Sequence, residues 1–113
     1  MPILLIYGVD KFEQTERFIM ALNKRIVDLR ELNLNEDDIT VKFVRSTGSY
    51  GEIIIFVEGL FDKPERTPEV RKQLAERLVE TTKRFCPDAT LIECLIRPFE
   101  PTLGFASIRI SQP

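Results

Sequence analysis

The chain has 113 residues, a length that suits one domain with a substantial core. Hydrophobic residues make up 43% and charged residues 30%, and the net charge of −2 gives no electrostatic reason to expect a nucleic acid or an anionic membrane as a partner. No apolar run approaches the length of a transmembrane span, and no basic region precedes the apolar start. We therefore expect a single cytoplasmic domain over residues 1–113.

The residue types that most often bind metals or move protons are scarce. The chain has no histidine, and its two cysteines, Cys86 and Cys94, are interpreted as small core residues in a reducing compartment. A zinc site is not expected, and we predict no cofactor. Any acid–base chemistry near neutral pH must use a group other than histidine.

The first half of the chain has the pattern strand, helix, strand. Ile3 to Tyr7 is a continuous apolar run ending at Gly8, which predicts a strand buried on both faces. Apolar residues spaced by three and four predict a helix from Phe12 to Leu34. Ile39 to Arg45 alternates in the manner of a strand, and residues 46–51 are typical of a turn-rich loop.

The second half repeats this order. Glu52 to Leu60 is β-branched and apolar on both faces, which predicts a central strand. Thr67-Pro68-Glu69 is a helix start, with a capping threonine, a proline at the first helical position and a glutamate near the positive helix end. The helix is expected to end at about Phe85, before Pro87, and Ala89 to Arg97 predicts a fourth strand.

The C-terminal tail, residues 100–113, follows two prolines. Pro98 and Pro101 exclude a regular central strand across this stretch. Leu103 to Ile110 alternates and predicts a short last strand, which could pair within the domain or reach a neighbouring subunit.

Residues 2–46 and 52–99 therefore form a repeat of pattern, each half being a β-α-β unit. The expected fold is α+β, a four-stranded mixed sheet with both helices on one face. A ferredoxin-like split β-α-β arrangement and a pair of pseudo-symmetric β-α-β units both fit. Because the central strands are apolar on both faces, the face without helices needs cover, from other copies of the chain or from the tail alone.

Met1-Pro2-Ile3 leads directly into the first predicted strand, and together with the two β-α-β halves and the length it resembles the tautomerase superfamily. That superfamily includes macrophage migration inhibitory factor and 4-oxalocrotonate tautomerase, and the resemblance is strongest to its long bacterial members. Val41-Lys42-Phe43 is similar to the strand that carries a substrate-binding arginine in 4-oxalocrotonate tautomerase. Gly48-Ser49-Tyr50-Gly51 is similar to its glycine-aromatic-glycine loop, and Leu103-Gly104-Phe105-Ala106 resembles a stretch near the end of macrophage migration inhibitory factor.

The resemblance implies a homotrimer with sheets around a central axis and an active site centred on a terminal proline. If Met1 is removed, Pro2 gains a free amine, whose ordinary pKa of roughly 7.7–8.0 would be lowered by burial and by a nearby cation. Such an amine could move a proton in a small carbonyl or enol acid as a general base. The candidate residues that would bind a substrate carboxylate or wall the site are Lys42, Arg45, Arg97, Tyr50 and Phe105.

The chain also departs from these relatives. Only Lys11 lies near the place of the arginine that follows the first strand in 4-oxalocrotonate tautomerase. Ile92 and Cys94 stand about where macrophage migration inhibitory factor has a tyrosine and an asparagine. If Met1 stays attached, Pro2 is a tertiary amide with no basic lone pair. The alternatives are a non-catalytic trimeric binding or structural protein of the same fold, and a ferredoxin-like small-molecule-binding module.

Overall fold

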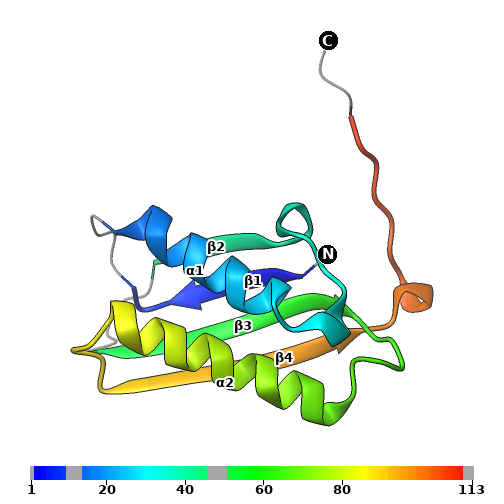
Figure 1. Cartoon of the computed structure of the whole chain (residues 1–113). Coiled ribbons are helices and arrows are strands. Elements are labelled where there is room, and N and C mark those ends of the chain that lie inside the picture. The colour runs from blue at the N-terminus through cyan, green and yellow to red at the C-terminus, as the bar shows by residue number, and fades with distance from the viewer. Residues whose placement is uncertain (1, 10–13, 46–50, 111–113) are drawn as a thin grey trace.

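A computed structural model of the chain describes residues 2–9, 14–45 and 51–110. It shows a four-stranded sheet with two helices on one face (Figure 1). Neither helix, within these residues, is long and apolar enough to cross a membrane. The main elements are β1 (Ile3–Tyr7), α1 (Thr15–Val27), β2 (Thr40–Val44), β3 (Glu52–Phe61), α2 (Pro68–Phe85) and β4 (Leu91–Phe99), with short 3₁₀ helices η1 (Arg30–Leu32), η2 (Glu36–Asp38) and η3 (Pro101–Leu103).

The strand order β2-β1-β3-β4 separates the two predicted architectures. β1 is parallel to β2, β3 is parallel to β4, and the two pairs meet where β1 and β3 run antiparallel. A ferredoxin-like sheet would pair the second strand with the third, but β2 and β3 are not neighbours here. The prediction of two consecutive β-α-β units is confirmed, and the ferredoxin-like alternative is wrong.

Local signals placed β1 and α2 correctly. β1 covers Ile3–Tyr7, as the apolar run predicts. The Thr67 side chain accepts a hydrogen bond from the Val70 amide at 3.2 Å, and Pro68 takes the first helical position, so the predicted cap forms. α2 ends at Phe85, just before the segment that leads to Pro87.

The first helix is shorter than predicted and ends at Val27 rather than Leu34. A helix over the whole predicted range would span about 35 Å, whereas the five-residue strands beside it span about 17 Å, so the chain must turn back earlier. It does so through η1, which lets both Leu29 and Leu32 enter the core. Asn33 then takes a left-handed backbone conformation, with φ of 51°.

The C-terminal part differs from the predictions in two places, the end of the fourth strand and the expected last strand. β4 continues through Pro98 to Phe99, across an irregularity between Val57 and Leu60 of β3. The prediction that the prolines exclude a regular central strand is confirmed, because β4 is an edge strand, where a missing backbone N–H is tolerated. No last strand forms between residues 104 and 110; instead this tail leaves the body of the molecule (Figure 1).

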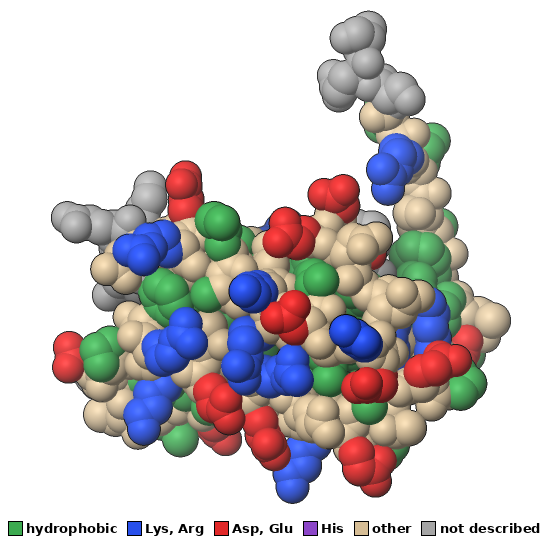
Figure 2. Space-filling model, in the orientation of Figure 1, with side chains coloured by type: hydrophobic (Ala, Val, Ile, Leu, Met, Phe, Trp, Pro, Cys, Tyr) green, Lys and Arg blue, Asp and Glu red, His purple; other side chains and the backbone are tan. Residues whose placement is uncertain are grey.

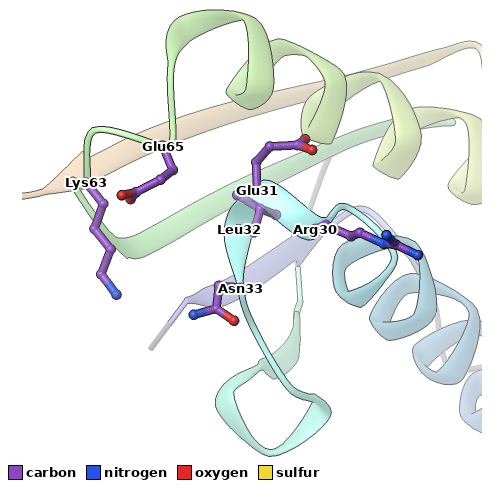
Figure 3. Close-up of a pocket in the computed structure, with 6 residues that line it drawn as sticks. All are labelled: Arg30, Glu31, Leu32, Asn33, Lys63 and Glu65. Atoms are coloured by element: carbon purple, nitrogen blue, oxygen red, sulfur yellow. The ribbon is translucent and has the colours of Figure 1, made fainter.

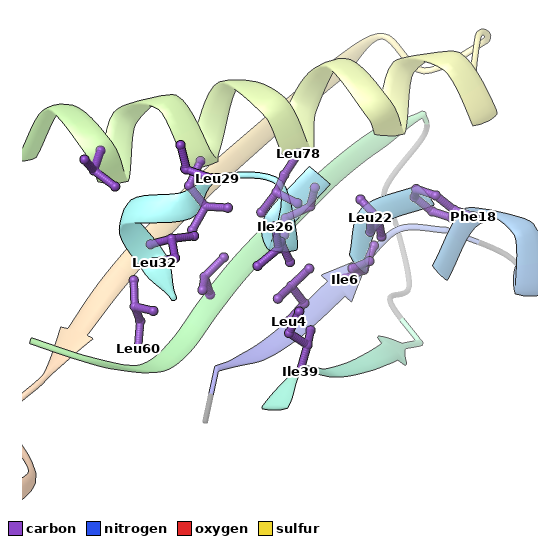
Figure 4. Close-up of a cluster of buried hydrophobic side chains, with 14 of the residues drawn as sticks. Leu4, Ile6, Phe18, Leu22, Ile26, Leu29, Leu32, Ile39, Leu60 and Leu78 are labelled. Atoms are coloured by element: carbon purple, nitrogen blue, oxygen red, sulfur yellow. The ribbon is translucent and has the colours of Figure 1, made fainter. Parts of the chain in front are cut away.

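The core lies between the sheet and the helices (Figure 4). Side chains from one face of β1 and β3 meet the inner faces of α1 and α2, and most are fully buried. Gly8 directly follows β1 with φ of 92°, and glycine is required there because a Cβ would stand 2.1 Å from the Glu52 carbonyl oxygen. The central members of the cluster are Leu4, Ile6, Ile55, Val57, Leu22, Ile26, Leu74 and Leu78.

The face of the sheet opposite the helices is uncovered in one chain, as the two-sided apolar strands predict. We call it the open face. Tyr7 and Phe56 lie there half-buried, in edge-to-face contact with ring centroids 5.7 Å apart. On β4, Leu91 and Leu95 are 42% and 46% exposed. Residues 104–110 do not lie over this face (Figure 1), so we expect a second molecule to cover it.

Candidate functional site

Pro2 sits at the start of β1 and is buried. Its carbonyl oxygen accepts a hydrogen bond from the Thr40 amide at 3.1 Å, which ties the proline to the beginning of β2. Pro2 alternates with Ile3 and shares its side of β1 with buried Leu4, so its ring points toward the helix-covered face. The strand start therefore holds this residue on a rigid, central element of the sheet.

Arg97 is the candidate cation at the Pro2 end of the sheet. Ile3 pairs with Glu58, and the Arg97 Nε lies 3.3 Å from the Glu58 Oε1. The Arg97 guanidinium also lies 5.3 Å from the ring centroid of Phe56, within cation–π range. Arg97 thus has a carboxylate partner already, and it lies on the open face.

Lys42 and Arg45 do not gather around Pro2 within one chain. Lys42 is exposed on the open face beside Leu5, in the middle of β1. Arg45 directly follows β2, and because β1 and β2 are parallel it lies at the sheet end opposite Pro2, about 17 Å along the strand. The remaining candidate, Tyr50, lies outside the described residues.

Phe105 belongs to an aromatic cluster at the Pro2 end. Its ring centroid lies 4.9 Å from that of Phe61 and 6.4 Å from that of Phe99, and Phe61 and Phe99 are 6.1 Å apart. These partners end β3 and β4, and the antiparallel pairing of β1 with β3 brings those ends to the start of β1. Phe105 remains 48% exposed, so it presents an apolar wall to solvent.

A polar pocket of about 480 Å³ also lies at this end, and sequence reasoning missed it. Figure 3 shows Lys63 and Glu65 reaching it from the segment between β3 and α2, with Asn33 on the segment that follows α1. The sequence did not predict this pocket, because the lining residues 30–33 were assigned to a continuous helix. Asn33 was the signal that could have shown where the helix stops, because asparagine tolerates a left-handed backbone. Its lining residues are Arg30, Glu31, Leu32, Asn33, Lys63 and Glu65.

Arg66 lies buried beside this pocket, with only 4% of its surface exposed. It donates from one terminal nitrogen to the Phe61 carbonyl at 2.7 Å and from the other to the Leu32 carbonyl at 2.6 Å. Burial lowers the pKa of the Arg66 guanidinium, whereas Glu65 and Asp38 raise it. The side chain thereby joins the end of β3 to η1, two segments that frame the pocket.

Among the described residues, the side that carries the helices shows no large charged patch of one sign. Figure 2 shows Lys and Arg side chains interspersed with Asp and Glu across this face. Within the described residues, no group of three or more His, Cys, Asp or Glu side chains could hold a metal ion.

The cysteines are partly buried, and Cys94 packs against the core. Burial raises the pKa of the Cys94 thiol to about 12 and raises that of Cys86 as well. Because the thiolate is the nucleophile, burial makes both groups weaker nucleophiles than a free cysteine.

We expect Cys94 to react with a thiol reagent such as 5,5′-dithiobis(2-nitrobenzoate) at least tenfold more slowly in the folded chain than in denaturant at pH 8. The raised pKa leaves little thiolate, and the packing limits access. Comparing Cys86→Ser and Cys94→Ser variants assigns each phase, and equal rates for folded and unfolded Cys94 would contradict the described burial.

No protein-family model matches the chain, and no curated protein matches it either. Several solved structures, in contrast, are similar in fold to this chain. A domain of unknown function (DUF1904) from Sebaldella termitidis is 19% identical over 94% of this chain and 95% of its own, with a TM-score of 0.71. A macrophage migration inhibitory factor-like protein from Entamoeba histolytica is 13% identical over 94% and 95%, with a TM-score of 0.67.

A third structure, described as an F6 fused 4-OT wild type asymmetric trimer, is 17% identical over 88% of both chains, with a TM-score of 0.66. At these identities the likeness concerns the fold. The chain has the tautomerase-like fold, with the same arrangement of paired β-α-β units that its first residues and repeat pattern predict.

Proposed function

We propose that this protein is a homotrimeric, cytoplasmic isomerase that moves a proton in a small carbonyl or enol acid. Pro2 would be the general base after removal of Met1, and no cofactor would be needed. The observation that carries this proposal is the placement of Pro2, buried at the start of a central strand in a tautomerase-like fold.

The proposed chemistry uses only the proline nitrogen and the substrate. The lone pair of neutral Pro2 takes a proton from the carbon beside a carbonyl, which leaves an enolate. The same proton returns from the charged amine to another atom of the substrate, so that the product is an isomer and Pro2 is neutral again. A nearby cation lowers the barrier by stabilising the enolate charge.

Under this proposal, the residues that surround Pro2 in the active site come from more than one chain. Arg97 and Phe105 lie at the Pro2 end of the same chain, whereas Arg45 would reach a Pro2 site only from a neighbouring copy. Lys42, on the open face, would likewise act between copies. Tyr50 keeps its proposed role as a wall of the site.

Trimer formation is supported by the uncovered open face and by solved structures of the same fold described as trimers. Burying half-exposed apolar side chains releases about 25 cal/mol for each Å² removed from water. We expect the native mass at micromolar concentration to be three times the chain mass of 13.1 kDa. Light scattering coupled to gel filtration measures this, and a monomer would exclude an interfacial site.

Intact mass under denaturing conditions decides whether the proposed base exists. A mass lower than that of the full chain by one methionine residue gives Pro2 a free amine. Retained Met1, together with a trimer that does not isomerise enol acids, would favour the second candidate, a non-catalytic trimeric protein of this fold. The pairing of Arg97 with Glu58 is the observation that supports this alternative.

A further inference from the structure

The polar pocket between η1 and the segment before α2 is lined by charged side chains of both signs. Its cations are Arg30 and Lys63, and all its charged side chains are exposed. Its carboxylates are Glu31 and Glu65. None of these four side chains forms an ion pair within the part of the chain that the structure describes. The pocket therefore offers charged groups that no other group of the described chain neutralises.

Hydrogen bonds fix the backbone on both sides of this pocket. On one side, the Asn33 amide donates to the Arg30 carbonyl at 3.0 Å and closes the turn of η1. On the other side, the Arg66 amide donates to the Lys63 carbonyl at 2.9 Å, and the Arg71 side chain donates to the Arg66 carbonyl at 2.6 Å. The Arg66 guanidinium joins the two sides. A ligand would thus meet a preformed site, which limits the entropy lost on binding.

Three polar side chains from the two facing segments lie around the same opening. Figure 3 shows Lys63 and Glu65 on the segment between β3 and α2, with the Asn33 side chain directed to the side where they lie. The lysine ammonium only donates hydrogen bonds, the glutamate carboxylate only accepts them, and the asparagine amide does both. This set can bind a positive and a negative group of one molecule.

The balance of charges decides which class of ligand fits. A simple anion would meet as many carboxylates as cations, and a simple cation would meet the same opposition. A molecule that carries both a carboxylate and an ammonium group can pair with both kinds of side chain. The volume of about 480 Å³ lies within the roughly 300–1,000 Å³ of small-molecule sites. Beside the pocket, the buried Arg66 Nε has no hydrogen-bond partner among the described residues, so a donor is available to an acceptor group.

We propose that this pocket binds a free amino acid, with the carboxylate of the ligand on Lys63 and its ammonium group on Glu65. The Asn33 amide contacts either group. The pocket shares no lining residue with the proposed Pro2 site, so binding here neither requires nor tests isomerisation.

A ligand panel on the full-length protein tests the proposal. Each of the twenty standard amino acids is added at about 10 mM, the melting temperature is recorded, and titration calorimetry gives the Kd of those that raise it. We expect at least one amino acid to bind with a Kd below about 1 mM. Its N-acetyl and carboxamide derivatives, which each lack one charge, are expected to bind at least tenfold more weakly. No binding below this Kd, or equal binding of either derivative, would overturn the proposal.

Variants then place the binding site. Lys63→Met and Glu65→Gln are each expected to raise the Kd at least tenfold, because each leaves one charge of the ligand unpaired. Lys72→Met and Glu76→Gln are the matched controls, since both residues are exposed on α2 outside this pocket, and they should keep the Kd within twofold. Equal effects of the two pairs of variants would overturn the assignment.

Pro2→Ala separates this proposal from the proposed function. We expect this variant to keep the Kd for the amino acid within twofold, whatever its effect on isomerisation. Loss of amino-acid binding in a folded Pro2→Ala protein would show that the ligand occupies the Pro2 site, and would overturn the separate pocket. An inactive wild-type protein that binds the amino acid would contradict the isomerase and leave the pocket standing.

Discussion

Replacing Pro2 with alanine is expected to lower kcat/KM for isomerisation of a small enol acid by about 10²–10⁴-fold, the usual contribution of a positioned acid–base group. Alanine keeps an amine but loses the ring that fixes the nitrogen on β1. Its primary amine is also free to rotate away from the substrate. Steady-state rates with phenylenolpyruvate and with a 2-hydroxymuconate-type substrate measure the change.

A matched control is Pro64→Ala, because Pro64 is an exposed proline in the segment between β3 and α2. This variant should keep the rate of the unchanged chain within twofold. Circular dichroism and native mass show whether Pro2→Ala still folds and assembles. Unchanged turnover in a folded Pro2→Ala trimer, or activity in a chain that retains Met1, would remove Pro2 as the base.

Replacing Arg66 with methionine is expected to lower the free energy of unfolding by about 3 kcal/mol. Methionine fills much of the same space but donates no hydrogen bond, so the Phe61 and Leu32 carbonyls are both left unpaired. Each buried group without a partner costs about 1–3 kcal/mol, and relief of the buried charge offsets part of that loss. Urea denaturation at a fixed chain concentration measures the difference.

Arg84→Met is the matched control, because Arg84 is exposed near the end of α2 and should change stability by no more than about 0.5 kcal/mol. Arg66→Lys provides a sharper comparison. Lysine keeps the charge, but its single ammonium group cannot match the planar fork that serves two carbonyls. If Arg66→Lys or Arg66→Met unfolds like the Arg84 variant, the two hydrogen bonds contribute little to the fold.

The regular elements were predictable where a local signal decides them. Apolar runs defined β1 and β3, and the Thr67-Pro68 cap fixed the start of α2. The end of α1 was not predictable in the same way. Helical spacing continues toward Leu29, but the short strands beside the helix force the chain to turn back.

The candidate site shows the same division between local and distant information. The place of Pro2 at the start of a strand was predictable from the apolar run that follows it, and its role in a site stays a prediction. The polar pocket and the bridge from Arg66 to Leu32 were not, because they join segments far apart in sequence. The position of Arg45 was not predictable either, because only the parallel pairing of β1 and β2 shows which end of the sheet it occupies.

The antiparallel pairing of β1 with β3 has a consequence for the speed of folding. Each β-α-β half closes its own parallel pair, yet the centre of the sheet forms only when the two halves meet. Closing the long loops between these strands costs chain entropy before the contacts between the two halves can stabilise the fold. We therefore expect the molecule to fold more slowly than helical bundles of similar size, because the contacts at the centre of its sheet join distant parts of the chain.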